Sequence, residues 1–268
     1  MLFGSEKDLL LKNLTSKSDK WKYRRYTGMP IRYAGGKSLA VGHVVEHIPN
    51  KTKKIISPFM GGGAVEIACA KDLNMEVNSF DIFDILTNYW QTQLSEPEKL
   101  AKKIEKWNND KETYNIVKKR LKLHWDKEKI IKDQINLAAH YWYNHNLSYG
   151  PGFLGWISKI HECPKKYKRM IDRVRNFKCP NLTVNHGDFA QVLPNHQKDF
   201  LYCDPPYYMG EDSKMFKGIY PQRNFPVHHN NFDHAKLRDI LHDHKNGFIV
   251  SYNDCETIRQ WYKGFKII

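Results

Sequence analysis

The apolar positions between residues 54 and 84 predict a β-strand, a helix and a second β-strand in succession. A β-branched run at 54–57 leads into a glycine-rich turn, which is followed by helical spacing over 64–72 and a strand pattern over 76–82. A strand, a crossover helix and a parallel strand make up the βαβ unit of α/β proteins. We therefore expect a parallel sheet to begin here.

Three further apolar runs between residues 181 and 254 predict three more strands. They lie in the segments LTVNHGD, DFLYCDPPY and GFIVSYND, and a helical pattern over 232–244 separates the last two. Strands that alternate with helices favour a mostly parallel sheet covered by helices. The expected fold class is therefore α/β.

The intervening segment, 96–178, has helical spacing and no comparable strand run. It contains 20 Lys and Arg against 10 Asp and Glu, so it carries most of the whole chain's net charge of +14. A solvated helical face would give the same count. However, the cluster HYWYNHNLSYGPGFLGW adds aromatic rings for base stacking and glycines for close backbone approach. We interpret the segment as a helical insert that binds nucleic acid.

The remaining composition narrows the class of protein. No apolar run approaches the ~20 residues of a membrane span, and residues 1–20 lack the apolar core of a secretion signal. The five cysteines are widely spaced and include no C-x-x-C pair of the kind found in zinc or redox sites. We expect a cytoplasmic protein with no membrane partner, no metal site and reduced, mostly buried cysteines.

The sharpest chemical signal is the DPPY motif that directly follows the apolar run FLYC. Two prolines end a strand because neither donates a backbone hydrogen bond, so the motif stands at a strand's carboxyl end, where open α/β sheets bind ligands. A carboxylate and a proline carbonyl there can accept the two hydrogens of an aromatic amine, and the tyrosine offers a stacking face. A strand-ending turn with a buried aspartate is the alternative. The candidate catalytic residues are Asp204, Pro205, Pro206 and Tyr207.

A second signal is the glycine-rich turn between the first strand and its helix, formed by Pro58, Phe59, Met60, Gly61, Gly62 and Gly63. Glycines allow the backbone to approach a ligand and helix amides to point at it, although a tight structural loop explains them equally well. Asp81, about 20 residues further on, ends the next strand, where a carboxylate can hold the ribose hydroxyls of a nucleoside cofactor.

The segment from Tyr33 to Ser38 ends in Gly-Lys-Ser, as a phosphate-binding loop does. The first glycine of such a loop is missing, because Ile31 occupies its position, and no strand run precedes the segment. An NTPase is therefore not expected.

In this order and spacing, the motifs resemble the Dam-like adenine-specific DNA methyltransferases over nearly the full length. The resemblance covers IRYAGGKS, PFMGGGAVE, SFDI, YNHNLSYGPGF, HGDF, DPPY, and FDHAKLRDIL followed by FIVSYND. It implies a Rossmann-like methyltransferase sheet that binds S-adenosylmethionine, with an inserted helical DNA target-recognition domain. The implied division is a catalytic domain at 28–95 and 179–268, an insert at 96–178 and an N-terminal extension at 1–27.

The resemblance also implies roles for individual residues. The cofactor contacts that it implies are Tyr33 and Lys37 at the methionine end, Pro58, Phe59, Gly61 and Gly63 along the turn, Asp81 and Ile82 at the ribose, Asp188 and Phe189 at the adenine, and Asp204. The DPPY residues would hold a flipped adenine beside the methyl group. The implied DNA contacts are Asn144, Asn146, Ser148 and Tyr149.

The implied activity is transfer of a methyl group to the N6 amine of adenine in a short duplex target, by base flipping and direct attack. Duplex DNA is then the partner, a cognate restriction endonuclease is a further partner that the family admits, and a monomer is expected. GATC is a target that only the resemblance suggests. The alternatives are methylation of cytosine's exocyclic amine and a non-catalytic DNA-binding relative. Methylation at carbon 5 of cytosine is disfavoured because Cys203 precedes Asp204 instead of following a proline.

Two further segments carry expectations. Residues 208–231 lack periodicity and contain several basic residues, so we expect them to close over the DNA. We expect His228, His229 and His234 to be solvated, because no acidic or cysteine ligand completes a metal set. The chain ends at FKII, whereas the resemblance implies further strand material, so a short or truncated chain is expected.

Overall fold

The computed structural model describes residues 3–17, 20–150, 152–159, 163–210 and 232–268. Within them, five strands form one sheet in the order β3-β2-β1-β4-β5, and every neighbouring pair is parallel. The predicted α/β class is confirmed. The strands are β1 Lys54–Ser57, β2 Glu76–Asp81, β3 Leu182–His186, β4 Phe200–Cys203 and β5 Phe248–Val250.

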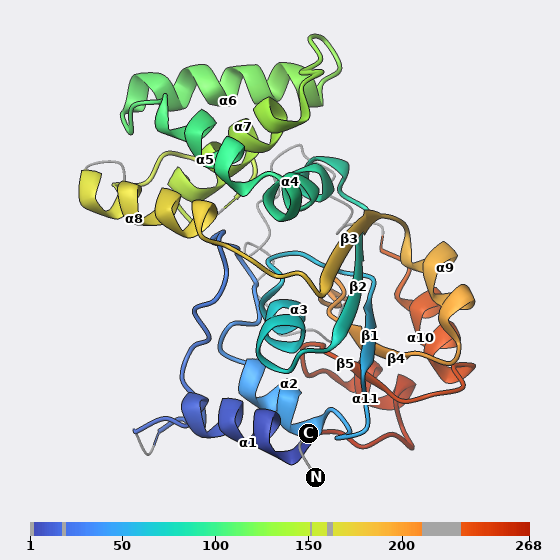
Figure 1. The fold of residues 1–268 in the computed structure, drawn as a ribbon. Helices are drawn as coiled ribbons and strands as arrows, with labels where there is room; N and C mark the ends of the chain where they lie inside the picture. The colour runs from blue at the N-terminus through green and yellow to red at the C-terminus, as the bar shows by residue number, and fades with distance from the viewer. Residues whose placement is uncertain (1–2, 18–19, 151, 160–162, 211–231) are drawn as a thin grey trace.

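Helices cover both faces of the sheet (Figure 1). On one face lie α2 (Val41–His47) and α3 (Ala64–Ile67), with α1 (Phe3–Leu14) outside them. The π-helical turn Ala68–Asp72 continues α3, so the helix predicted over 64–72 is present. The other face is covered by α9 (Phe189–Val192), α10 (His234–His242) and α11 (Glu256–Trp261).

Alternating side chains of the strands build two hydrophobic cores. Ile55 and Tyr202 belong to the core that includes α2 and α3, whereas Ile56, Leu201 and Cys203 belong to the core beneath α9 and α10. Successive residues of a strand point to opposite faces, so apolar residues at every strand position bury the sheet on both sides. This explains why β4 is a continuous apolar run in the sequence and why both central residues of β1 are apolar.

Four helices between β2 and β3 form a separate lobe at one end of the molecule (Figure 1). They are α5 (Pro97–Glu105), α6 (Lys111–Trp125), α7 (Gln134–Leu147) and α8 (Pro164–Arg175), and α4 (Asp84–Ser95) lies between them and the sheet. No strand of the sheet lies among the described residues of 96–178. Every residue of α7 from 137 to 147 is buried, so α7 is the central helix of this lobe.

Two buried tryptophans connect the helical lobe and α4 to the loops at the sheet. Trp142 on α7 donates its indole N–H to the carbonyl oxygen of Pro30 at 3.2 Å, and Trp90 on α4 donates to Gly61 at 2.9 Å. Both side chains are fully buried, and one continuous core runs from the sheet into the lobe. The lobe therefore fixes the position of the loops that carry the candidate site.

Other whole-chain expectations concern membranes and cysteines. Among the described residues, none of the helices combines the length and apolar character needed to cross a bilayer.

The five cysteines are free, and all except the half-buried Cys163 are buried, which confirms the expectation that they are mostly buried.

We predict that the N-cap of α7 stabilises the fold measurably. The Asp133 carboxylate accepts a hydrogen bond from the Asn136 backbone N–H at 2.6 Å. Asp133→Ala removes this acceptor and should lower the free energy of unfolding by about 1 kcal/mol, measured by urea denaturation. Asp133→Asn retains an acceptor and should stay close to wild type. Equal losses in both variants would contradict the capping role.

Candidate active site

The carboxyl ends of three adjacent strands bring the predicted site residues to one edge of the sheet. β1 pairs in parallel with β2 on one side and with β4 on the other. Asp81 is the last residue of β2, and Asp204 directly follows β4. Ligands bind in α/β proteins at this edge, so the two carboxylates can belong to one site.

An ion pair links Asp204 to Lys37, which lies 167 residues earlier in the chain. The two side chains are only 20% and 15% exposed, and the Lys37 ammonium lies 4.7 Å from the centre of the Tyr207 ring. Burial lowers the pKa of Lys37, but Asp204 and Tyr207 outweigh it and the net shift is upward. Burial raises the pKa of Asp204, and Lys37 partly offsets that rise. Lys37 thus lowers the cost of ionising a carboxylate in this largely dry position.

The two prolines of the motif directly follow Asp204 in the chain. Pro205 is buried, and Pro206 is half-buried. β4 ends at Cys203, as expected for a strand that runs into two residues without a backbone N–H. Cys203 itself is fully buried, and burial raises the pKa of its thiol, so it is a core residue and not a nucleophile.

The Asp81 carboxylate holds the glycine-rich turn against the end of β2. It accepts hydrogen bonds from the backbone N–H of Gly61 at 3.0 Å and of Phe83 at 2.9 Å. Gly63, with a φ of 65°, precedes α3 in the left-handed region that favours glycine. Pro58 is buried, whereas Ile82 next to Asp81 is 37% exposed. The hydrogen bonds of Asp81 therefore fix the position of the glycine-rich turn relative to the end of β2.

Tyr33 packs directly on this turn. A Cβ atom on Gly62 would lie 2.6 Å from the Cβ of Tyr33, which is closer than carbon atoms approach, so only glycine fits. The tyrosine ring also stacks on His145 of α7, with ring centres 5.2 Å apart. His145 stacks in turn on Tyr141 at 5.1 Å. Tyr33 therefore contacts both the glycine-rich turn and the helical lobe.

An aromatic cluster lies beside the turn. The ring of Phe59 is 5.7 Å from Phe189 and 5.6 Å from Phe232, centre to centre. Asp188 accepts a hydrogen bond from the Ala190 backbone N–H at 2.8 Å and so caps α9. The two residues predicted to contact an adenine thus lie next to the glycine-rich turn.

Three of the four predicted DNA contacts are interior residues in this structure. Asn144 bonds to Tyr114 and Leu154, Asn146 to Trp142 and Arg32, and Ser148 to His145 and Gly152. Each is at most 1% exposed, whereas Tyr149 is 78% exposed. Here the three buried polar groups hold the end of α7 together, and only Tyr149 presents its side chain to solvent.

Glu66, a buried acid near the Lys37–Asp204 pair, was not predicted from the sequence. It accepts a hydrogen bond from the Ser57 hydroxyl at 2.6 Å, and desolvation raises the pKa of its carboxyl to about 7. Its charge also interacts with those of Asp204 and Lys37. The available signal was a single charged residue in the apolar run 64–70. His145 and Arg32 were also missed, because nothing in the local pattern separates them from surface residues.

The predicted DNA-closing segment lies mostly outside the described residues, as do His228 and His229. His234 shares a hydrogen bond of 2.9 Å with the hydroxyl of Tyr252. In the part of the chain that the structure describes, no group of three or more His, Cys, Asp or Glu side chains is arranged to hold a metal ion.

Comparison with known proteins identifies the family. The model of the D12 class N6 adenine-specific DNA methyltransferases matches residues 33–268. The chain belongs to this family. That span contains the five strands, the helical lobe and every site residue that the sequence predicted, so the predicted resemblance is confirmed.

Individual relatives are distant and differ in length. The type II methyltransferase M.FokI of Planomicrobium okeanokoites is 24% identical over 299 residues, which cover 99% of this chain but 43% of that protein. The type II methyltransferase M1.LlaDCHI of Lactococcus lactis subsp. cremoris is 25% identical over 88% of this chain and 84% of its own length. The DNA N-6-adenine-methyltransferase of Escherichia phage P1 is 24% identical over 88% of this chain and 31% of its own. The chain thus spans less than half of two of these relatives.

We predict a pH-dependent stability difference between wild type and Glu66→Gln. Folded Glu66 keeps its proton up to a pH of about 7, whereas the unfolded side chain ionises near 4.5. The folded state therefore binds more protons between these values, and wild-type stability falls as pH rises through this window. Glutamine still accepts from Ser57 and carries no charge. The variant should gain stability relative to wild type by up to about 1.4 kcal/mol per pH unit, seen in urea midpoints. A difference that does not change with pH would refute this.

Proposed function

We propose that this protein transfers the methyl group of S-adenosylmethionine to the N6 amine of adenine in duplex DNA. The observation that carries the proposal is the buried Lys37–Asp204 ion pair beside Tyr207, at the same sheet edge as Asp81 and the glycine-rich turn. Membership of an adenine-specific family supports adenine over the cytosine alternative. A cognate restriction endonuclease and a monomeric state stay predictions.

The residues at the turn fit a nucleoside cofactor chemically. A half-buried carboxylate, Asp81, suits ribose hydroxyls, and the aromatic pair Phe59 and Phe189 suits the flat face of an adenine. The clash that a Cβ on Gly62 would make indicates a backbone packed closely around Tyr33. We assign Tyr33 and Lys37 to the methionine end of the cofactor, as the family resemblance implies. S-adenosylmethionine supplies an electrophilic methyl group bound to a sulfonium.

Asp204 is suited to activate the adenine amine. The lone pair of an aromatic amine is delocalised into its ring, so the site must localise it before the nitrogen can attack a methyl group. Lys37 occupies Oδ1 of Asp204, and the second carboxylate oxygen can accept one amine hydrogen. The carbonyl of Pro205 can accept the other. Tyr207 stacks on the base, which must leave the duplex to reach this buried position.

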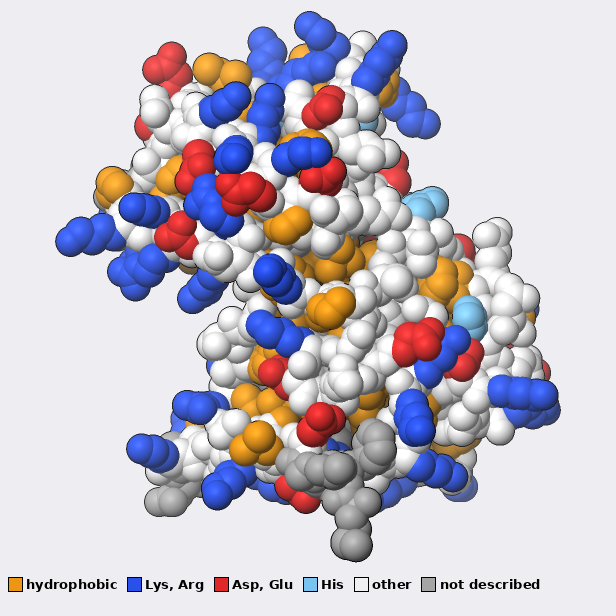
Figure 2. Space-filling view, viewed as in Figure 1, with side chains coloured by type: hydrophobic (Ala, Val, Ile, Leu, Met, Phe, Trp, Pro, Cys, Tyr) orange, Lys and Arg blue, Asp and Glu red, His pale blue; other side chains and the backbone are white. Residues whose placement is uncertain are grey.

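The helical lobe and its neighbouring loops are the proposed DNA-binding surface. Figure 2 shows a waist between the helical lobe and the sheet, with Lys and Arg side chains spread over the lobe and mixed with acidic ones. The exposed Tyr149 lies two residues beyond the end of α7, close in sequence to His145, whose ring stacks on Tyr33. We propose that DNA contacts the side of the lobe that carries Tyr149, and that the target adenine is flipped out of the duplex towards Asp204.

We expect Asp204→Ala to abolish methyl transfer. Loss of the acceptor should reduce the rate by about 100-fold or more, while duplex binding stays close to wild type because phosphates dominate affinity. Incorporation of labelled methyl groups and fluorescence anisotropy measure the two effects. Asp243→Ala, which removes an equal charge from the exposed end of α10, is the matched control. Normal turnover in Asp204→Ala would exclude the mechanism.

We expect Asp81→Ala to weaken cofactor binding by about tenfold or more, because it removes a charged acceptor and the anchor of Gly61. Isothermal titration with S-adenosylmethionine measures this change. Asp81→Asn retains the shape and one acceptor and should give an intermediate affinity. Unchanged affinity in the alanine variant would remove Asp81 from the cofactor site.

A further inference from the structure

A solvent-accessible cavity of about 370 Å³ lies between segment 25–38, α3 and the helical lobe. Its wall includes Tyr33 and Gly62 but not Asp81, Asp204 or Tyr207. The cavity therefore adjoins the candidate active site without being part of it.

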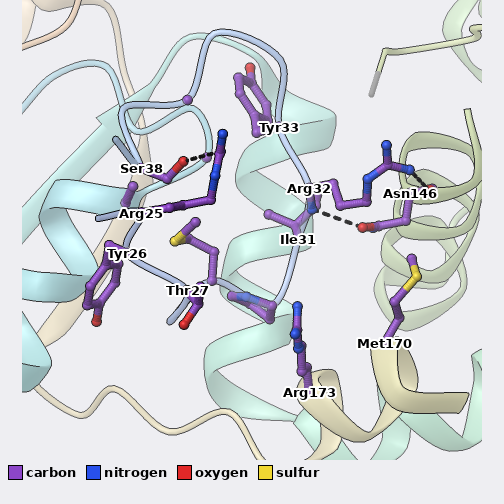
Figure 3. Close-up of a pocket in the computed structure, with 15 residues that line it drawn as sticks. Arg25, Tyr26, Thr27, Ile31, Arg32, Tyr33, Ser38, Asn146, Met170 and Arg173 are labelled. Carbon is purple, nitrogen blue, oxygen red and sulfur yellow. Dashed lines mark hydrogen bonds between the residues drawn. The ribbon is translucent and has the colours of Figure 1, made fainter. Parts of the chain in front are cut away.

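Three arginines line this cavity, and none of its lining residues is acidic (Figure 3). Arg25 and Arg32 come from the segment before the glycine-rich turn, whereas Arg173 comes from α8. Among the described residues, none of the three guanidinium groups lies within 4.0 Å of a carboxylate. Burial lowers the pKa of Arg32, and no acid counteracts it. Three positive charges thus face one space without a counterion, which favours an anionic ligand.

The two flanks of α8 differ in their acidic partners. Arg175 forms ion pairs with Glu98 at 3.0 Å and with Glu105 at 2.6 Å. Met170 and Arg173, three residues apart and so on one side of the helix, line the cavity instead. On one flank of α8, Arg175 is therefore paired with acidic residues of the protein itself. On the other flank, Arg173 faces the cavity and can bind an external anion.

Two of the guanidinium groups are already held in place. Arg32 donates to the carbonyl oxygen of Asn146 at 2.7 Å, and Arg25 donates to the hydroxyl of Ser38 at 2.7 Å (Figure 3). A guanidinium has five N–H donors, so each group retains donors for a ligand. Planar, fixed donors match the oxygen atoms of a phosphate group.

We propose that this cavity binds a backbone phosphodiester of the DNA substrate, held mainly by Arg173 and Arg25. The inference rests on the proposed function, because that function supplies the DNA. Met29, Ile31 and Met170 give the cavity apolar walls that suit the deoxyribose beside the phosphate. A free phosphate ion would leave most of this volume unfilled. A phosphate held here would fix the DNA against both the lobe and the segment that carries Tyr33.

The test compares duplex binding by wild type, Arg173→Ala, Arg25→Ala and the control Lys168→Ala. Lys168 is an exposed residue of α8 about 140° around the helix from Arg173, so its loss removes the same charge from another flank. Anisotropy titrations at several NaCl concentrations give log K against log[salt]. Each arginine variant should bind about tenfold more weakly and show a slope smaller by about 1, equally for duplexes of any sequence. The control should retain the wild-type slope.

Arg173 is exposed, so its variant should fold, which circular dichroism verifies. In methylation assays Arg173→Ala should raise KM for DNA and leave kcat and cofactor affinity unchanged. A wild-type slope in this variant, or an equal loss in Lys168→Ala, would overturn the proposal. A third result would also overturn it: inorganic phosphate raises the melting temperature of wild type but not of Arg173→Ala, while the two proteins bind DNA with equal affinity. The ligand of the cavity would then be free phosphate.

The same data separate this inference from the proposed function. If wild type methylates DNA and both arginine variants match it in KM and slope, only the phosphate site fails. If wild type binds no S-adenosylmethionine and methylates no DNA, the proposed function itself is refuted.

Discussion

The parallel pairing of β1 with β2 and β4 is the constraint on which the whole site depends. Because the three strands run in the same direction, their carboxyl ends meet at one edge, and the residues that follow them become neighbours. Asp81 then reaches the backbone of Gly61, and Asp204 emerges on the other side of β1. Reversal of either strand would place the two carboxylates at opposite ends of the sheet.

The helical lobe supports this edge, in addition to the DNA-binding role that we propose for it. Trp142, Asn146 and His145, all on α7, contact Pro30, Arg32 and Tyr33 respectively. Buried polar groups such as Asn146 cost free energy unless they are hydrogen-bonded, and its side chain is bonded on both sides. Segment 25–38, which supplies Lys37, Tyr33 and two of the arginines, is thus positioned by residues more than 100 positions later. If the lobe binds DNA as proposed, the DNA would contact the same element that positions segment 25–38.

Local pattern was sufficient to predict the sheet, but it was not sufficient for contacts across the chain. β1, α3 and β2 were predictable because fully buried strands produce continuous apolar runs and the turn is rich in glycine. The ion pair between Lys37 and Asp204 depends on tertiary structure, which no local spacing encodes. Asn144, Asn146 and Ser148 were predicted as DNA contacts because they are polar, yet polar side chains in an aromatic stretch also pair internally, as these do. Their role towards DNA stays a prediction.

The central claim is that a carboxylate at the end of β4 activates the amine of an extruded adenine for methylation. The most direct measurement is to incubate the protein with plasmid DNA and S-adenosylmethionine carrying a labelled methyl group, and then to identify the labelled nucleoside by mass spectrometry. The account predicts N6-methyladenine. Label on the exocyclic amine or carbon 5 of cytosine, or none despite bound cofactor and DNA, would contradict it.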